Sequence, residues 1–396
     1  MKCTGFGATG KGKVRDHNED RFLVDDELGL YLVCDGMGGH QAGEVAAQRA
    51  VEFVRERVGN SGDLLARFRE EDSEDSEVIS FVEDLIQAAC AEVSRLAASQ
   101  LEHLRMGTTL TLVLQLGGRA VMGHVGDSRL YLVRDEQVHQ LSDDHTYASE
   151  LMRVGVIAPE EVRNHTYSHV LTRSVGPKEI VRVDTLLFDL LPGDVLVLCT
   201  DGLSYYLEGA EDILEVLDSG DLRNVPAGLV ELANSRGGRD NVSVVVVSAE
   251  ARRTPQRSNK KETIVLKRME ALGQMPAFSG LQVRDLLRLA NVLDVVEVKT
   301  GGDPVTEAGY LRAYGLLLTG SMETDASVLK PGDCFGVESI AAEAVDVPAR
   351  RALEDSMVAM LPWKEVDRLA RRRPRLGYRI FRNLVCKLAS EGRLQP

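Results

Sequence analysis

The sequence lacks the features that mark secreted and membrane-spanning proteins. No apolar run of about eighteen residues occurs among its 396 residues, so we expect no transmembrane helix. The N-terminus has no apolar core and does not resemble a secretory signal. The six cysteines are far apart and form no CxxC pair, a pattern typical of reduced thiols in a cytoplasmic protein.

Basic residues are also scarce. The chain has 47 Lys and Arg against 61 Asp and Glu, which gives a net charge of -14. Proteins that bind nucleic acid by neutralising its phosphates need clustered Lys and Arg, so the charge argues against that class. We therefore expect neither a nucleic-acid nor a membrane partner. A phosphorylated substrate remains compatible with this charge if metal cations supply the positive charge.

The composition changes at about residue 250. Before it, strand-like apolar runs alternate with helical patterns over residues 43–58 and 78–101. Residues 251–264 are polar and basic and contain a proline, which is typical of a linker. Residues 265–396 combine a helical segment, short strands separated by glycines and a basic terminal helix. We therefore expect a first domain over 1–250 and a second, smaller domain over 265–396.

Aspartates next to the apolar runs are the main functional signal in the first domain. Asp35 follows YLVC, Asp127 follows VMGHVG, Asp201 follows VLVLCT, and Asp240 lies just before VSVVVV. Strand ends can meet at one rim of a sheet system, which would bring these carboxylates together. Two carboxylates about 4 Å apart repel by roughly 4 kcal/mol at an effective dielectric constant near 20. Such a cluster either has raised pKa values or binds divalent cations.

The chemistry of the donor atoms indicates which cations would bind. Oxygen ligands without accompanying His or Cys favour Mg²⁺ or Mn²⁺ over zinc. Gly36, directly after Asp35, lets the backbone approach closely, so its carbonyl can add another oxygen ligand. A single Asp-Gly pair is more often a turn. Repetition of acidic motifs in one domain makes a shared site the better interpretation.

The ordered motifs RDHNED, DGMGGH, GDSR, TDG and RDN resemble those of the metal-dependent (type 2C, PPM) protein phosphatases in their bacterial form. The resemblance covers about residues 2–249. It implies an α+β fold, a four-layer αββα sandwich in which two antiparallel sheets pack face to face between helices. It also implies hydrolysis of phosphoserine and phosphothreonine on proteins by metal-activated water. The partners would then be phosphorylated proteins, the products of a serine/threonine kinase.

The resemblance assigns metal ligands residue by residue. Asp35 would bridge two metal ions, and Asp201 and Asp240 would complete the protein ligands of the first. The Gly36 carbonyl would serve the second ion, and Asp127 a weaker third. The implied cofactor is therefore two Mn²⁺ or Mg²⁺ ions, with occupancy of a third site left open.

Further residues match the family's pattern or depart from it. Glu19 and Asp20 resemble the outer-shell groups that hold metal-bound water, and Arg15 resembles the arginine that orients the substrate phosphate. Met37 stands where many eukaryotic members have the histidine proposed as general acid, which leaves the acid for the leaving group unassigned. Tyr205 stands where many members have an aspartate that contributes to the third metal site. Residues 142–173 resemble the variable flap beside the family's active site.

The second domain resembles the cyclic-nucleotide-binding domain family over roughly residues 265–395. The implied fold is a short β-roll bracketed by helices. Read without gaps, the sequence has Val337 where the family has the ribose-binding glutamate and Asp346 where it has the phosphate-binding arginine. A carboxylate repels a cyclic phosphate, so we predict no cyclic-nucleotide binding. An offset of a few residues would instead provide Glu338 with Arg350 or Arg351.

Three functional hypotheses follow. The first is an active phosphatase whose C-terminal domain regulates it or contacts either a protein partner or the phosphatase domain. The second is a cyclic-nucleotide-responsive sensor with phosphatase output, which Val337 and Asp346 disfavour. The third is an inactive phosphatase-like scaffold, which the presence of Asp35, Asp201 and Asp240 disfavours.

Overall fold

The computed structural model of the chain divides into two compact units, Met1–Arg252 and Arg253–Pro396. The residues that it describes are 1–38, 42–70, 74–99, 106–209, 211–218, 220–251, 258–325, 327–337 and 350–390. No helix within these ranges has the length and apolar character needed to cross a membrane.

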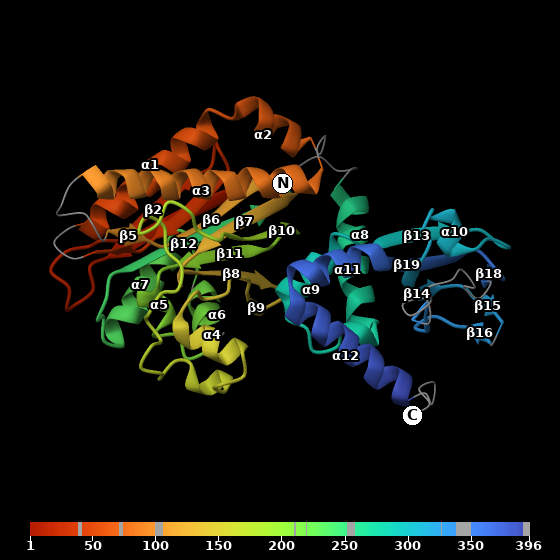
Figure 1. The fold of residues 1–396 in the computed structure, drawn as a ribbon. Coiled ribbons are helices and arrows are strands. Elements are labelled where there is room, and N and C mark those ends of the chain that lie inside the picture. The colour runs from red at the N-terminus through yellow and green to blue at the C-terminus, as the bar shows by residue number, and fades with distance from the viewer. Residues whose placement is uncertain are drawn as a thin grey trace. The chain divides into compact units, whose positions relative to one another are not determined.

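The first unit contains two five-stranded antiparallel sheets (Figure 1). In spatial order the first sheet consists of β1 (Lys2–Gly10), β12 (Val242–Glu250), β11 (Val195–Cys199), β8 (Arg129–Arg134) and β9 (Gln137–Gln140). The second consists of β10 (Asp184–Asp189), β7 (Arg119–Val125), β6 (Leu110–Leu116), β3 (Leu30–Cys34) and β2 (Arg21–Asp25). A two-stranded ladder pairs β4 (Gly36–Met37) with β5 (Gly107–Thr108).

Helices cover the outer face of each sheet. The helices on the second sheet are α1 (Ala42–Gly59), α2 (Gly62–Arg69) and α3 (Asp75–Ser99). Those on the first are α5 (Asp201–Ser204), α6 (Glu211–Asp218) and α7 (Val225–Ser235). The segment between β9 and β10 contains α4 (Tyr147–Arg153) and the 3-10 helix Pro159–Glu161. The expected arrangement of two sheets between helical layers is confirmed for this unit.

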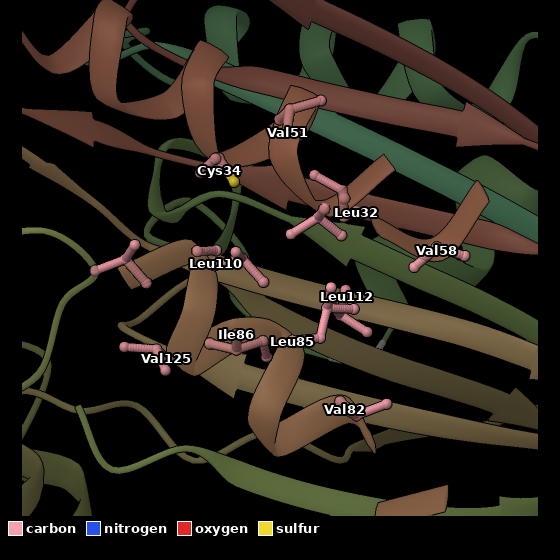
Figure 2. Close-up of a cluster of buried hydrophobic side chains, with 14 of the residues drawn as sticks. Leu32, Cys34, Val51, Val58, Val82, Leu85, Ile86, Leu110, Leu112 and Val125 are labelled. Atoms are coloured by element: carbon pink, nitrogen blue, oxygen red, sulfur yellow. The ribbon is translucent and has the colours of Figure 1, made fainter. Parts of the chain in front are cut away.

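The buried faces of α1 and α3 explain why the helical periodicity could be read from the sequence. Val51 and Val58 on α1 and Val82 and Ile86 on α3 point into one apolar cluster with the strand residues Leu32, Leu110 and Leu112 (Figure 2). Gly123 on β7 lies beneath α3, where a Cβ atom would come within 2.5 Å of Ile86 Cδ1. The close approach of this helix to its sheet therefore requires glycine at that position.

The strands that face each other across the sandwich are nearly continuous apolar runs. Residues of β3, β11 and β12 are almost completely buried, because each sheet has the other on one side and helices on the other. Polar side chains then collect at the strand ends, where the backbone emerges from the apolar layer.

The second unit contains two small antiparallel sheets, five α-helices and the 3-10 helix Pro276–Phe278 among its described residues. One sheet has the order β13 (Asp294–Val298), β19 (Ser356–Pro362), β14 (Ala313–Thr319) and β17 (Cys334–Phe335). The other has the order β16 (Val328–Leu329), β15 (Met322–Thr324) and β18 (Arg350–Ala352). The helices are α8 (Ser258–Gln274), α9 (Val283–Ala290), α10 (Pro304–Glu307), α11 (Trp363–Arg372) and α12 (Pro374–Ser390). The unit is thus rich in strands, and helices precede its first strand and follow its last strand in the sequence.

The beginning of α8 differs from the expected linker. The helix starts at Ser258, inside the stretch 251–264 that the composition marked as linker. Strong helix formers such as Lys and Glu are common in this stretch, and polarity alone does not distinguish an exposed helical turn from a flexible connection.

Candidate active site

Four strand ends place their aspartates around one pocket of about 840 Å³ in the first unit. Asp35 directly follows β3 and Asp201 follows β11 by two residues, while Asp127 lies just beyond β7 and Asp240 just before β12. The strands β3 and β7 belong to the second sheet, and β11 and β12 belong to the first. The sandwich therefore brings together carboxylates that are about 200 residues apart in the sequence.

Thr109 fixes the backbone around Asp35. The Asp35 amide donates a hydrogen bond of 2.9 Å to Thr109 Oγ1, and the Thr109 amide donates one of 2.9 Å to the Asp35 carbonyl. Thr109 Oγ1 also lies 2.7 Å from Ser128 Oγ, in the turn that carries Asp127. One buried hydroxyl thus links the turns of two pocket aspartates.

Gly36 follows Asp35 where two other backbone segments approach closely. A Cβ atom at Gly36 would lie 2.2 Å from the Gly43 carbonyl oxygen and 2.6 Å from the Glu19 carbonyl oxygen. Only glycine fits there, and it lines the pocket together with Asp35. Gly36 thus lies at the pocket beside Asp35, and the role of its carbonyl as a metal ligand stays a prediction.

Arg15 and Asp240 form an ion pair at the pocket, with 2.6 Å between Arg15 Nη2 and Asp240 Oδ2. Asp240 Oδ1 accepts a hydrogen bond from the Asn241 amide. The hydrogen bond with Asp240 raises the pKa of Arg15, so the guanidinium stays charged. The expected phosphate-orienting arginine and an expected metal ligand thus lie within contact distance of each other.

Glu19 and Asp20, expected to act together, occupy different places. Glu19 lines the pocket, and its amide donates a hydrogen bond of 2.8 Å to Asn241 Oδ1. Asp20 is fully buried and accepts a hydrogen bond of 2.8 Å from Thr200 Oγ1. Burial, together with the charges of nearby carboxylates, raises the pKa of Asp20 to about 7.

The electrostatics of the pocket follow from this crowding of carboxylates. Desolvation raises the pKa of Asp35 well above its ordinary value, and the charges of Asp20, Asp201 and Asp127 raise it further. The pKa values of Asp127 and Asp201 are also raised, first by desolvation. Bound cations would reverse these shifts, because they favour the charged carboxylates.

The donor atoms fit a hard divalent cation. They are carboxylate and carbonyl oxygens, and Oδ1 of Asp201 is buried without a hydrogen-bond partner among the described residues. Over the described ranges, however, no three acidic, histidine or cysteine side chains already surround one point as a ligand set. The contacts of Asp35 and Gly36 hold the backbone around these oxygen atoms in place.

Two pocket residues occupy the positions where the sequence departs from the family pattern. Met37 lines the pocket and has no proton to donate. Tyr205 also lines it, with its ring 5.7 Å from that of His169 and 5.6 Å from the guanidinium carbon of Arg163. Arg163 Nη2 donates a hydrogen bond to the Tyr205 carbonyl. Tyr205 therefore anchors the segment that was expected to be a flap.

Several pocket residues were not singled out from the sequence. His169 has Nδ1 4.0 Å from Asp201 Oδ2, and Arg239 lies at the pocket's exposed edge. Asn241 Nδ2 donates hydrogen bonds to the carbonyls of Lys11 and His17, which holds the N-terminal loop against the pocket. Arg239 and Asn241 had a signal, because both belong to the RDN motif, although the motif does not show what either side chain contacts. A lone His in a polar segment has none.

The second unit places Val337 in its apolar core, with 4% of its surface exposed. Arg350 is also buried, and its guanidinium carbon lies 5.0 Å from the centre of the Phe335 ring. Asp346 and Glu338 lie outside the described residues. The resemblance of this unit to cyclic-nucleotide-binding domains remains a prediction.

Comparison with known proteins connects the first unit with one enzyme family. The family model described as Protein phosphatase 2C matches residues 9–226. The serine/threonine phosphatase stp of Listeria innocua is 35% identical over 243 residues, which are 60% of this chain and 93% of that protein. The protein phosphatase PhpP of Streptococcus pneumoniae is 31% identical over 245 residues, 61% of this chain and 95% of its own.

Solved structures give the same result. The serine/threonine phosphatase PstP/Ppp of Mycobacterium tuberculosis matches with a TM-score of 0.56 and 31% identity, over 63% of this chain and 100% of that one. A structure described as the catalytic domain of PstP in complex with 2 manganese ions matches with a TM-score of 0.54 and 30% identity, over 63% of this chain and 99% of its own. The similarity therefore extends over about the length of the first unit.

Proposed function

The chain belongs to the protein phosphatase 2C family and is a protein serine/threonine phosphatase, and from this we propose that it removes phosphate from phosphoserine and phosphothreonine using two divalent cations, Mn²⁺ or Mg²⁺. The observation that carries the proposal is the convergence of Asp35, Asp127, Asp201 and Asp240 on one pocket beside Arg15. The manganese ions in the related PstP catalytic domain support the choice of metal.

We assign the metal-holding role to the residues that line the pocket with oxygen atoms. Asp35, Asp201 and Asp240, together with the Gly36 carbonyl, would hold the two cations, and Asp127 would serve a third. When bound, divalent cations activate water for attack on phosphorus and neutralise charge on the phosphoryl group.

The chain's own side chains and backbone supply orientation. Arg15 presents N–H donors that suit phosphoryl oxygens, and its ion pair with Asp240 fixes its position at the pocket. Thr109 holds the Asp35 backbone, and Asn241 holds Glu19. The leaving alkoxide must gain a proton that Met37 cannot give, so we propose that water delivers it. The expected substrates are proteins phosphorylated by a serine/threonine kinase.

For the second unit we propose a regulatory or protein-binding role. Val337 offers no hydrogen-bond acceptor on its side chain and is enclosed in the apolar core of the unit, which disfavours a cyclic-nucleotide site at this position. The apolar core explains why the unit keeps a compact fold without such a ligand.

The metal proposal is tested by replacing Asp35. We expect Asp35→Ala to abolish Mn²⁺-dependent hydrolysis of p-nitrophenyl phosphate and of a phosphothreonine peptide, with a loss of at least about a hundredfold. Asp84→Ala is the matched control, because Asp84 is an exposed carboxylate on α3, outside the pocket. Turnover in Asp35→Ala equal to that of Asp84→Ala would remove the proposed mechanism.

A further inference from the structure

Two arginines line the active-site pocket, and they differ in how their charge is compensated. Arg15 is paired with Asp240. Arg239 is exposed, and its guanidinium has no ion pair or hydrogen bond with any residue in the described part of the chain. Arg239 is therefore a cation at the pocket edge that is available to a substrate.

The backbone that carries Arg239 is held rigidly. Its amide donates a hydrogen bond of 3.0 Å to Tyr206 Oη, and the preceding Gly238 accepts one of 2.6 Å from the Lys13 amide. Gly237 and Gly238 have φ values of 144° and 57°, a turn that glycine adopts without strain. Because the base of the side chain is fixed, less entropy is lost when the guanidinium binds a group.

The surroundings of this arginine are strongly acidic. Residues 1–252 contain 24 Lys and Arg against 43 Asp and Glu, a net charge of -19. The pocket itself carries the carboxylates of Glu19 and the four aspartates. Two bound divalent cations would offset four of these charges and change the net charge of the unit from -19 to -15. An acidic side chain next to the phosphorylated residue of a substrate would therefore still meet a negative potential unless a cation paired with it.

We propose that Arg239 binds a carboxylate of the protein substrate next to the phosphorylated residue, so that the enzyme prefers phosphosites with acidic neighbours. Arg15 and the proposed cations would bind the phosphoryl group. Arg239 lies at the exposed edge of the pocket, where it can contact the residues that flank the phosphorylated residue of a protein substrate. A guanidinium pairs with a carboxylate through two parallel N–H donors. This inference rests on the proposed phosphatase function and names a substrate class for the same site.

The test compares two phosphothreonine peptides in the full-length enzyme with Mn²⁺. One has Glu at the positions on both sides of the phosphothreonine, and the other has Gln there. We expect wild type to favour the Glu peptide by about three- to tenfold in kcat/KM, mainly through a lower KM. Arg239→Gln should remove that preference, Arg239→Lys should retain part of it, and Arg223→Gln, an exposed arginine outside the pocket, should leave it unchanged.

Three results would overturn the inference. A Glu preference that persists in Arg239→Gln, or that wild type never shows, means that Arg239 does not read a flanking carboxylate. An equal loss for both peptides and for p-nitrophenyl phosphate means that Arg239 binds the phosphoryl group instead. Failure of wild type to hydrolyse p-nitrophenyl phosphate at all would instead contradict the phosphatase function on which the inference depends.

Discussion

Replacing Thr109 with valine tests whether its buried hydroxyl organises the active site. Valine has nearly the same shape, so the change removes hydrogen bonds without leaving a cavity. The Asp35 amide loses its acceptor and Ser128 Oγ loses its neighbour at 2.7 Å. Thr109 is 1% exposed, so water does not easily replace these partners. Each buried group left without a partner costs about 1–3 kcal/mol, so two such groups give an expected loss of about 2–6 kcal/mol in the free energy of unfolding.

Thr109→Ser is the matched control, because it keeps the hydroxyl and removes only a methyl group. The loss should then be about 1 kcal/mol. The assay is urea unfolding followed by far-UV circular dichroism. The single tryptophan of the chain, Trp363, lies in the second unit. Its fluorescence therefore reports the unfolding of that unit.

The same substitution should also affect catalysis. Because Thr109 links the turns that carry Asp35 and Asp127, we expect Thr109→Val to need a higher Mn²⁺ concentration for half-maximal activity, while Thr109→Ser stays near wild type. The reasoning is refuted if Thr109→Val unfolds at the same urea concentration as wild type and shows the same dependence on Mn²⁺.

Two further predictions concern other parts of the chain. Burial lowers the pKa of His124 to about 4, below its value near 6.5 in the unfolded state. As the pH falls, the unfolded state therefore binds the proton first. The free energy of unfolding should fall by up to about 3 kcal/mol as the pH decreases from 6.5 to 4. Urea unfolding at several pH values should show a flatter profile for His124→Gln but not for exposed His17→Gln; equal slopes would contradict this. Calorimetric titration of the full chain with cyclic AMP and cyclic GMP should show no saturable binding in the micromolar range, and clear saturation would overturn the interpretation of Val337.

The long helices and the apolar strands were predictable from the sequence because burial imposes a period on them. The pattern over residues 43–58 corresponds to α1, Ala42–Gly59. The pattern over residues 78–101 corresponds to α3, Asp75–Ser99, except for its last two residues, which lie outside the described ranges. Each helix has one buried face, so the apolar positions recur at helical spacing. The start of α8 was not predictable in this way, since the residues there are polar and carry no such period.

The aspartates were recognisable for a different reason, which also shows where sequence reasoning ends. A carboxylate at the end of a buried strand stands out against its apolar neighbours, and four such positions in one domain point to one rim. Contacts between side chains of distant segments have no comparable pattern in the sequence. Three features depend instead on how loops pack across the rim. They are the different environments of Glu19 and Asp20, the hydrogen bond from Arg163 to Tyr205 and the uncompensated charge of Arg239.

This difference determines which assignments deserve experiment first. The acidic residues follow from motif order and from their convergence in space, so a single substitution such as Asp35→Ala tests them together. Arg239 belongs to the RDN motif, but the motif does not show whether its charge is compensated. The structure does, since Arg15 pairs with Asp240 and Arg239 has no ion pair among the described residues. Because the first unit stays acidic even with two divalent cations bound, an unpaired arginine at the edge of the site is a means of selecting acidic substrates.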